Sequence, residues 1–165
     1  MRLFVLLGIF IMLGVNSLAQ SPAASVEKIN LKQLQDLIET PDDQTRIINF
    51  WATWCRPCVA EMPHFEAIHN RYTSEGVSVI FVSLDFADNL EKRVIPFVER
   101  KGIQAKVVLL DESDAAQWMP AIQPDWQGNI PATLVVNNKK GIRSFYAQEL
   151  SESDLENILQ PIIHP

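Results

Sequence analysis

Cys55 and Cys58 are the residues of this chain best suited to covalent chemistry, and they are its only cysteines. At the start of a helix, two cysteines three positions apart lie at about the distance that a disulfide needs. A bridge that closes so short a loop removes little entropy from the unfolded chain, so it would stabilise the fold only weakly. A disulfide that forms easily and stabilises weakly is suited to being made and broken. The spacing therefore favours redox use over a structural bridge or a metal site.

The residues next to Cys55 favour the thiolate that disulfide exchange requires. Unpaired N–H groups and the dipole at a helix N-terminus stabilise negative charge there. Arg56 adds a cation, unless it extends into solvent that screens its charge, and Pro57 stiffens the turn. We therefore expect Cys55 to be the exposed, attacking sulfur. Cys58, one turn into the helix, should be more buried and should resolve the mixed disulfide.

The cysteines follow a buried strand and begin a long helix. The apolar run 46–51 predicts a strand buried on both faces of a parallel sheet. Residues 56–72 predict the helix, which Pro63 should kink, and Asn30 and Ser151 are expected to cap two other helices. The remaining pattern predicts strands at 26–30, 77–84, 107–110, 132–136 and 142–147, helices at 31–39, 89–101, 113–119 and after Ser151, and a loop at 120–129. This alternation indicates an α/β sheet with helices on both faces.

The first 19 residues have the pattern of a secretory signal peptide. Arg2 supplies a positive charge, residues 3–15 are apolar, and residues 17–19 place small side chains where a signal peptidase cleaves. An uncleaved N-terminal anchor is the alternative, although the apolar run is short for a membrane span. In either case we expect a protein that works outside the cytoplasm, with a signal peptide at 1–19, a flexible leader at 20–25 and one domain at 26–165.

The charge of the chain makes nucleic acid and anionic membranes poor partners. The formal net charge is −6 at pH 7 and becomes −7 when Arg2 is removed. Lys92-Arg93 and Lys139-Lys140 are isolated basic pairs rather than parts of a basic cluster. A single domain of this size has room for a core of its own, and we expect it to act as a monomer.

The segment 50–58 (Phe-Trp-Ala-x-Trp-Cys-x-Pro-Cys) resembles the active-site strand and turn of thioredoxins. Pro63 matches the proline that kinks the active-site helix of that family, and Ile130-Pro131 matches the cis-proline loop that faces the cysteines. Glu61, the signal peptide and the long segment 85–129 narrow the resemblance to the exported TlpA/ResA-like thiol-disulfide oxidoreductases. The resemblance implies a thioredoxin-like three-layer α/β/α fold with a central mixed sheet and an extra strand-helix insertion.

The resemblance draws attention to Glu61 and Asn49 as residues that bear on proton transfer at the site. Glu61 lies three positions after Cys58, on the same helical face. Burial would raise its pKa and let it shuttle the Cys58 proton, whereas an exposed helix glutamate is the alternative. Asn49 occupies the position where thioredoxins have a buried aspartate. Because asparagine cannot titrate, we expect Glu61 to take over the proton.

The resemblance also implies how a substrate is held. Pro131 should follow a cis peptide bond and expose the backbone of Ile130 for strand-like pairing with a substrate segment. Trp54 should shield Cys55. Trp118 and Trp126 either pack in the core or form a rim that faces the substrate.

These likenesses lead us to expect a thiol-disulfide oxidoreductase that acts on cysteine-containing exported proteins. The resemblance suggests the reducing direction, with electrons from a membrane thiol reductant and with apocytochrome cysteines as a specific substrate in cytochrome c maturation. A disulfide-forming oxidant is the alternative. The redox disulfide is the only cofactor expected.

Metal binding and peroxidase activity fit the residues less well than disulfide exchange does. His64 and His69 are five positions apart on one predicted helix, so they diverge instead of joining the cysteines in a zinc site. We expect no metal, although Cu(I) favours thiolates and copper handling by a thioredoxin-like exported protein stays open. The peroxiredoxin nucleophile needs a threonine or serine three positions before it and a proline four further back. Ala52 and Ile48 occupy those positions here.

Overall fold

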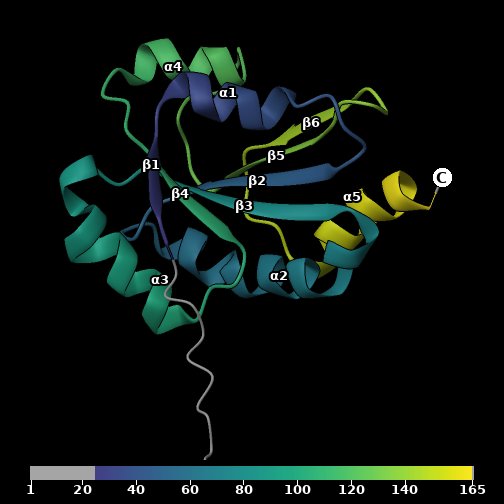
Figure 1. Cartoon of the computed structure of the whole chain (residues 1–165), viewed down its shortest axis with the longest axis horizontal. Coiled ribbons are helices and arrows are strands. Elements are labelled where there is room, and N and C mark those ends of the chain that lie inside the picture. The colour runs from purple at the N-terminus through teal and green to yellow at the C-terminus, as the bar shows by residue number, and fades with distance from the viewer. Residues whose placement is uncertain (1–24, 165) are drawn as a thin grey trace, which may run out of the picture.

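A six-stranded sheet lies between two layers of helices in the computed structural model, which describes residues 25–164 (Figure 1). The strand order is β1-β4-β3-β2-β5-β6, with the first four parallel and β5 and β6 antiparallel to their neighbours. The strands are β1 Glu27–Ile29, β2 Thr45–Trp51, β3 Val77–Ser83, β4 Lys106–Leu110, β5 Ala132–Asn137 and β6 Ile142–Tyr146. The predicted mixed sheet is confirmed. The predicted signal peptide, residues 20–24 of the predicted leader and residue 165 lie outside the described residues.

Helices cover both faces of the sheet, as expected (Figure 1). Those of the described part are α1 Leu31–Glu39, α2 Arg56–Tyr72, α3 Ile95–Lys101, α4 Ala115–Ile122 and α5 Glu152–Ile163. The helices α1 and α4 pack over one face in one hydrophobic cluster, and α2, α3 and α5 pack over the other face in a second cluster. Between β3 and β5 the chain adds β4, α3 and α4, whose status as a subfamily insertion stays a prediction.

Strand β2 is the centre of the sheet, and all of its residues are buried. It pairs with β3 on one side and with β5 on the other. Trp51, its last residue, lies opposite Ser83 at the end of β3. Because the two strands are parallel, the segments that follow them emerge at the same edge of the sheet. This edge holds the cysteines.

Helix α2 begins at Arg56, directly after Cys55, as the sequence predicts. The Sγ atom of Cys55 caps the helix by accepting a hydrogen bond from the backbone N–H of Cys58, at 3.3 Å. The helix continues through Pro63 to Tyr72. Its buried side packs against the sheet, which outweighs the hydrogen bond that the proline removes.

Two predicted helices differ from the structure. The segment 89–101 begins with a 3-10 turn and a π-helix, Leu90–Val94, before α3 starts. Pro96 has no N–H and its ring would crowd the preceding turn, and the wider π-turn, in which Ile95 donates to Leu90, relieves this conflict. The helix predicted at 113–119 begins at Ala115 and extends to Ile122, into the predicted loop. Trp118 and Ile122 are one turn apart and both buried, so packing sustains the helix past Pro120.

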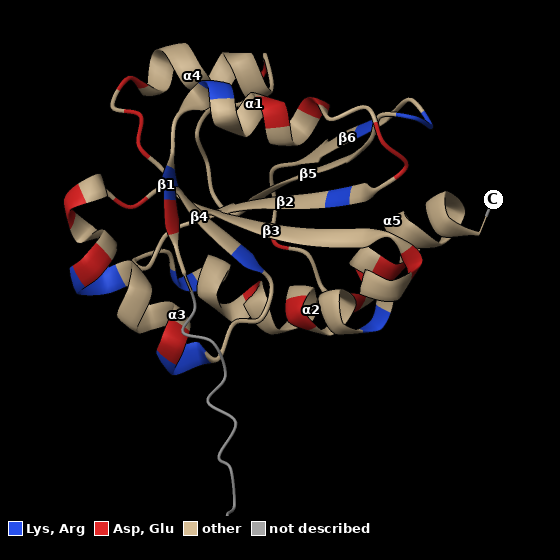
Figure 2. Cartoon of the chain, viewed as in Figure 1, with Lys and Arg blue, Asp and Glu red and all other residues tan. Residues whose placement is uncertain are grey.

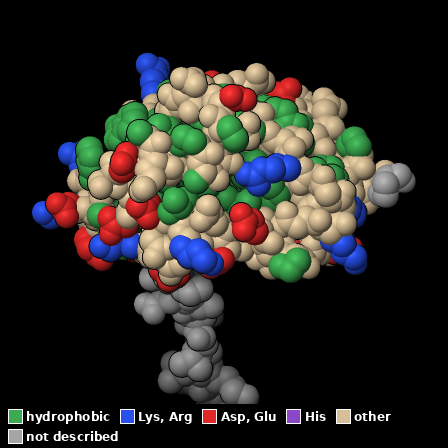
Figure 3. All heavy atoms as spheres, turned by 90° about the horizontal axis from the view of Figure 1, so that it is seen from above, with side chains coloured by type: hydrophobic (Ala, Val, Ile, Leu, Met, Phe, Trp, Pro, Cys, Tyr) green, Lys and Arg blue, Asp and Glu red, His purple; other side chains and the backbone are tan. Residues whose placement is uncertain are grey.

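Charged side chains lie mainly on the helices and the connecting loops (Figure 2). On the face seen in Figure 3, acidic and basic side chains are interspersed rather than gathered by sign. Within residues 25–164, none of the helices has both the length and the apolar character needed to span a membrane.

Candidate active site

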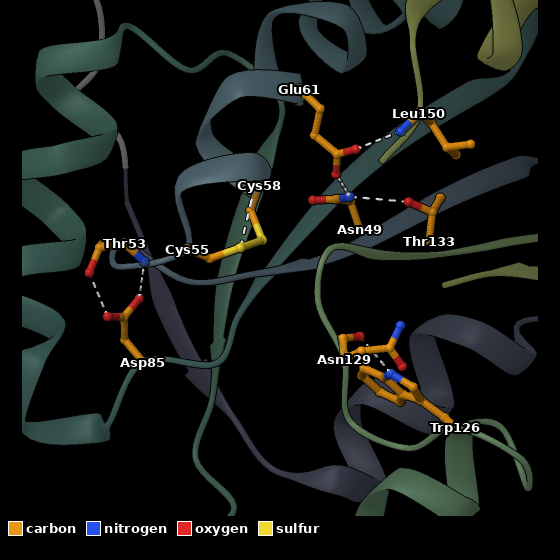
Figure 4. Close-up of a disulfide and its surroundings, with 10 residues drawn as sticks. All are labelled: Asn49, Thr53, Cys55, Cys58, Glu61, Asp85, Trp126, Asn129, Thr133 and Leu150. Atoms are coloured by element: carbon orange, nitrogen blue, oxygen red, sulfur yellow. Dashed lines mark hydrogen bonds between the residues drawn. A yellow bond between two sulfur atoms is a disulfide. The ribbon is translucent and has the colours of Figure 1, made fainter. Parts of the chain in front are cut away.

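Cys55 and Cys58 form a disulfide at the start of α2, with Cα atoms 5.3 Å apart (Figure 4). Cys55 is 5% exposed and Cys58 is not exposed at all. The expected order of burial is confirmed, but Cys55 is not the exposed sulfur that the sequence predicted. It caps the helix and packs with Trp51 and Ala52 in the core cluster, which leaves only an edge of the side chain to solvent.

Arg56 and Pro57, between the two cysteines, are both exposed. Solvent around Arg56 screens its charge, so its contribution to a nearby thiolate is weakened. The helix N-terminus is the better source of stabilisation for negative charge on Cys55, because the cap already directs an N–H at its sulfur.

Glu61 is fully buried, so the alternative of an exposed helix glutamate is wrong. Burial raises the pKa of its carboxyl from 4.5 to about 7, although two hydrogen bonds act in the opposite direction. These come from the backbone N–H of Leu150 and from Nδ2 of Asn49, each at 2.8 Å (Figure 4). A carboxyl with this pKa exchanges its proton near neutral pH.

Asn49 connects Glu61 with the neighbouring strand. Its Nδ2 also donates to Oγ1 of Thr133, at 3.1 Å, and the two residues are paired across the antiparallel strands β2 and β5. Its Oδ1 is buried and has no hydrogen-bond partner within the described residues. The sequence drew attention to Asn49 but not to Thr133 or Leu150. Cross-strand register would have revealed Thr133, had the pairing of β2 with β5 been known in detail.

Thr53 and Asp85 form a second contact that the sequence did not predict. Asp85 is almost fully buried and accepts hydrogen bonds from the backbone N–H of Thr53, at 2.8 Å, and from its hydroxyl, at 2.6 Å (Figure 4). The hydroxyl of Ser83 donates to the same carboxylate at 2.9 Å. The turn that leads to Trp54 and Cys55 is therefore tied to the end of β3. The signal in the sequence was weak: two polar residues, each just after a buried strand.

The Ile130–Pro131 peptide bond is cis, as the resemblance implied. Ile130 is half-buried against both hydrophobic clusters. The preceding loop is fixed by Trp126, whose indole N–H donates to the backbone carbonyl of Asn129 at 3.0 Å (Figure 4). The Asn129 side chain also donates to the carbonyl of Ala147, at 3.1 Å.

The tryptophans divide into a buried group and one exposed residue. Trp118 and Trp126 pack edge to face, with ring centres 5.3 Å apart, and both are buried. Core packing is therefore the correct alternative for these two residues, and Trp51 is likewise in the core. Trp54 is 65% exposed, and its expected shielding of Cys55 stays a prediction.

Two hollows border the Thr53–Asp85 contact. One, of about 410 Å³, is lined by Asp85, by the exposed Phe86 and Asp88 and by the half-buried Glu112, among others. The other, of about 280 Å³, lies between Thr53 and three basic residues of the π-helix Leu90–Val94 and of α3: Lys92, Arg93 and Arg100. The surface around the active-site turn thus offers charge of both signs and exposed aromatic rings.

Residues 25–164 contain no group of three or more His, Cys, Asp or Glu side chains placed to hold a metal ion.

The model of the AhpC/TSA family matches residues 18–145, which is most of the chain. The chain belongs to the AhpC/TSA family. Among curated relatives of this AhpC/TSA-family chain, the thiol-disulfide oxidoreductase ResA of Halalkalibacterium halodurans is 31% identical over 118 residues, covering 70% of this chain and 60% of that protein. The resemblance to ResA-like proteins is confirmed. This AhpC/TSA-family chain spans only 60–61% of the length of the first three such relatives.

Solved structures show the same fold as this AhpC/TSA-family chain. A thioredoxin-related protein from Neisseria meningitidis serogroup B is 25% identical, with a TM-score of 0.62 over 73% of this chain and 86% of that one. A thiol:disulfide interchange protein of the thioredoxin family from Chlorobium tepidum is 20% identical, with a TM-score of 0.61 over 75% and 83%. The predicted thioredoxin-like fold is therefore confirmed.

Proposed function

We propose that this protein is a thiol-disulfide oxidoreductase that exchanges disulfides with other proteins through Cys55 and Cys58. The observation that carries the proposal is the Cys55–Cys58 disulfide at the N-terminus of α2, with the buried carboxyl of Glu61 on the same helix. The name of the ResA relative, a thiol-disulfide oxidoreductase, supports it.

The exchange has two steps, and each conserves electrons and protons. In the reduced protein, the Cys55 thiolate attacks a substrate disulfide, forms a mixed disulfide and releases one substrate thiolate. Cys58 then loses its proton and attacks Sγ of Cys55, which re-forms the disulfide found in the structure and releases the second substrate thiolate. The substrate gains two electrons and, once its thiolates are protonated, two protons.

Cys55 takes the attacking role because it is the more accessible of the two sulfurs. The N–H of Cys58, 3.3 Å from that sulfur, and the helix dipole stabilise the thiolate. Cys58 is fully buried and cannot meet a substrate disulfide directly. It can attack only the neighbouring Cys55 sulfur, which suits the resolving step.

Glu61 takes up the proton that Cys58 releases. Its pKa of about 7 means that near neutral pH a large fraction of the protein holds the carboxylate form, and an equally large fraction can return a proton. Asn49 cannot take up the proton, because it is an amide at the position where thioredoxins have a buried aspartate.

A substrate segment pairs with the backbone at Ile130, next to the cis Pro131, and contacts Trp54 and Phe86, which are 65% and 81% exposed. The substrate segment belongs to a cysteine-containing exported protein, and the predicted signal peptide supports an extracytoplasmic site of action. We propose the reducing direction, with electrons from a membrane thiol reductant and with an apocytochrome c as the most specific substrate, because the sequence motifs resemble those of the exported TlpA/ResA-like proteins.

Cysteine variants test the proposal cleanly, because the chain has no other thiol. The wild-type protein should accelerate the reduction of a peptide disulfide by dithiothreitol, and Cys55→Ser should abolish the acceleration. Cys58→Ser should instead accumulate a one-to-one mixed disulfide, whose protein partners can be identified after expression in the native compartment. A wild-type protein that is inert towards disulfides, with no adduct on Cys58→Ser, would overturn the proposal.

A further inference from the structure

The side-chain amide of Asn49 is buried, and its nitrogen forms hydrogen bonds while its oxygen forms none within the described residues. Its Nδ2 donates to the Glu61 carboxylate and to the Thr133 hydroxyl. Its Oδ1 is inaccessible to solvent and has no partner within the described residues. An amide oxygen left in this state costs free energy, so such atoms are rare in folded proteins and call for an explanation.

The groups that accept hydrogen bonds from Nδ2 determine the orientation of the Asn49 amide. An ionised Glu61 can only accept hydrogen bonds, so the amide turns its N–H groups towards that carboxylate and its oxygen away from it. Figure 4 shows the result: the nitrogen of Asn49 lies towards Glu61 and Thr133, and the oxygen points towards the Cys58 side of the disulfide.

A disulfide has no hydrogen to donate, so it cannot satisfy this oxygen. A Cys58 thiol has one S–H donor. We infer that Asn49 Oδ1 accepts a hydrogen bond from the Cys58 thiol in the reduced protein, and that Asn49 is therefore a positioning residue for the resolving sulfur.

The inference rests on the proposed redox cycle. Reduction by an external dithiol breaks the Cys55–Cys58 bond, forms the disulfide of the reductant and transfers two electrons and two protons to the two sulfurs. One of those protons is the donor that Asn49 Oδ1 lacks in the oxidised protein. Reduction therefore completes the buried hydrogen-bond network, and the reduced state is favoured relative to a protein without the amide.

The same contact links Cys58 with Glu61. Oδ1 of Asn49 accepts from the thiol while Nδ2 donates to the carboxylate, so one rigid side chain holds both groups. The amide does not carry the proton. It holds the thiol in its protonated form until the Cys55 sulfur becomes part of a mixed disulfide, which the Cys58 thiolate can attack.

Asn49→Leu tests the inference, with Thr133→Val as the matched control. The leucine has a similar size and removes the amide, whereas Thr133→Val removes a partner of Nδ2 and leaves Oδ1 in place. In a dithiothreitol redox buffer, Asn49→Leu should shift the equilibrium towards the disulfide by about 5- to 10-fold. Thr133→Val should stay near the wild-type constant. An Asn49→Leu constant equal to that of the wild type would overturn the inference.

Repeating the substitution in a Glu61→Leu background separates a direct effect from one that acts through Glu61, because leucine has no donor that could turn the Asn49 oxygen away from Cys58. A direct hydrogen bond to Cys58 predicts that the shift persists without the carboxylate. A shift that disappears in Glu61→Leu would mean that Asn49 acts on the carboxylate alone, and the inference would fail.

Cys58 can also be observed alone in Cys55→Ser protein, which needs no exchange activity. With Asn49 present, the S–H stretching band should lie below the frequency of a free thiol, and in Asn49→Leu it should return towards that frequency. A free-thiol band in the presence of Asn49 would show that the amide oxygen does not reach the sulfur, and the inference would fail. Because the band is measured with native Asn49, this test holds even if Asn49→Leu does not fold. It also fails or succeeds independently of the disulfide-exchange assay.

Discussion

The carboxylate of Glu61 accepts a hydrogen bond from the backbone N–H of Leu150, 2.8 Å away and 89 positions later in the chain. Leu150 lies just before Ser151, the N-cap of α5. The candidate proton acceptor on α2 is therefore also part of the connection that places α5 against the same face of the sheet. Changes at Glu61 must be read for stability as well as for activity.

The protonation of Glu61 makes the stability of the fold depend on pH. Its pKa is 4.5 in the ordinary, exposed state and about 7 in the folded protein. Between these values the unfolded chain releases the proton while the folded protein keeps it, so a rise in pH favours unfolding. Relative to Glu61→Gln, the wild type should lose about 3 kcal/mol of unfolding free energy between pH 4.5 and a pH above 7.

Urea denaturation of the two proteins across this range measures the difference. Below pH 4.5 both states hold the proton, so the pH-dependent difference should vanish there. Glu99→Gln is the control for the loss of a glutamate, because Glu99 is exposed and forms no ion pair within the described residues. A constant offset between wild type and Glu61→Gln at every pH would contradict the raised pKa.

Asp85 should be a structural support of the active-site turn. Asp85→Ala leaves the N–H and hydroxyl of Thr53 and the hydroxyl of Ser83 without their acceptor. We expect a loss of about 2–3 kcal/mol in unfolding free energy, together with slower disulfide exchange because the turn before Cys55 is released. Asp88→Ala, an exposed neighbour, should change stability by less than about 0.5 kcal/mol. Equal effects of the two substitutions would rule out this role for Asp85.

Two tryptophans near the site should respond in opposite ways. Trp126 is buried among Phe50, Trp118 and Phe145, so Trp126→Ala should cost about 3–5 kcal/mol of stability. Trp54 is 65% exposed, so Trp54→Ala should change stability by less than about 0.5 kcal/mol. If Trp54 contacts the substrate, its loss should slow exchange with a protein disulfide more than exchange with a small one. Thermal unfolding and exchange rates on both substrates check the pair.

The parts of the structure that the sequence predicted are those set by local interactions. Asn30 and Ser151 form capping boxes with residues three positions later, and a local pattern of this kind is readable without a fold. Helix α2 begins and ends where the motif places it because the cysteine cap and the apolar spacing are also local. The π-turn before α3 was not predicted. It accommodates Pro96, which lacks an N–H and crowds the preceding turn, and the spacing of apolar residues carries no sign of this effect.

The contacts that complete the site were harder to predict because they join distant parts of the chain. Thr53 and Asp85 are 32 positions apart, and Asn49 and Thr133 are 84 apart. Each pair meets only because the sheet places β2 between β3 and β5. The burial of Cys55 likewise depends on how the core cluster packs around the turn, which the order of residue types along the chain does not show. The sequence thus singled out Cys55, Cys58 and Glu61 as candidates, while tertiary packing decided what surrounds them.

The release of the second substrate thiol should follow the ionisation of Glu61. Above its pKa of about 7 the carboxylate can take the Cys58 proton, and below this pH it already holds one. The resolving rate should therefore fall as pH drops through about 7 in the wild type, beyond the decline caused by the thiol itself. In Glu61→Gln the rate at pH 8 should be about 10²-fold lower, the lower end of what a positioned proton acceptor contributes, and its pH profile should lack this inflection. Stopped-flow release of thiol from a preformed Cys55 mixed disulfide isolates the step. An inflection near pH 7 that persists in Glu61→Gln would assign it to another group and remove Glu61 from the proton transfer.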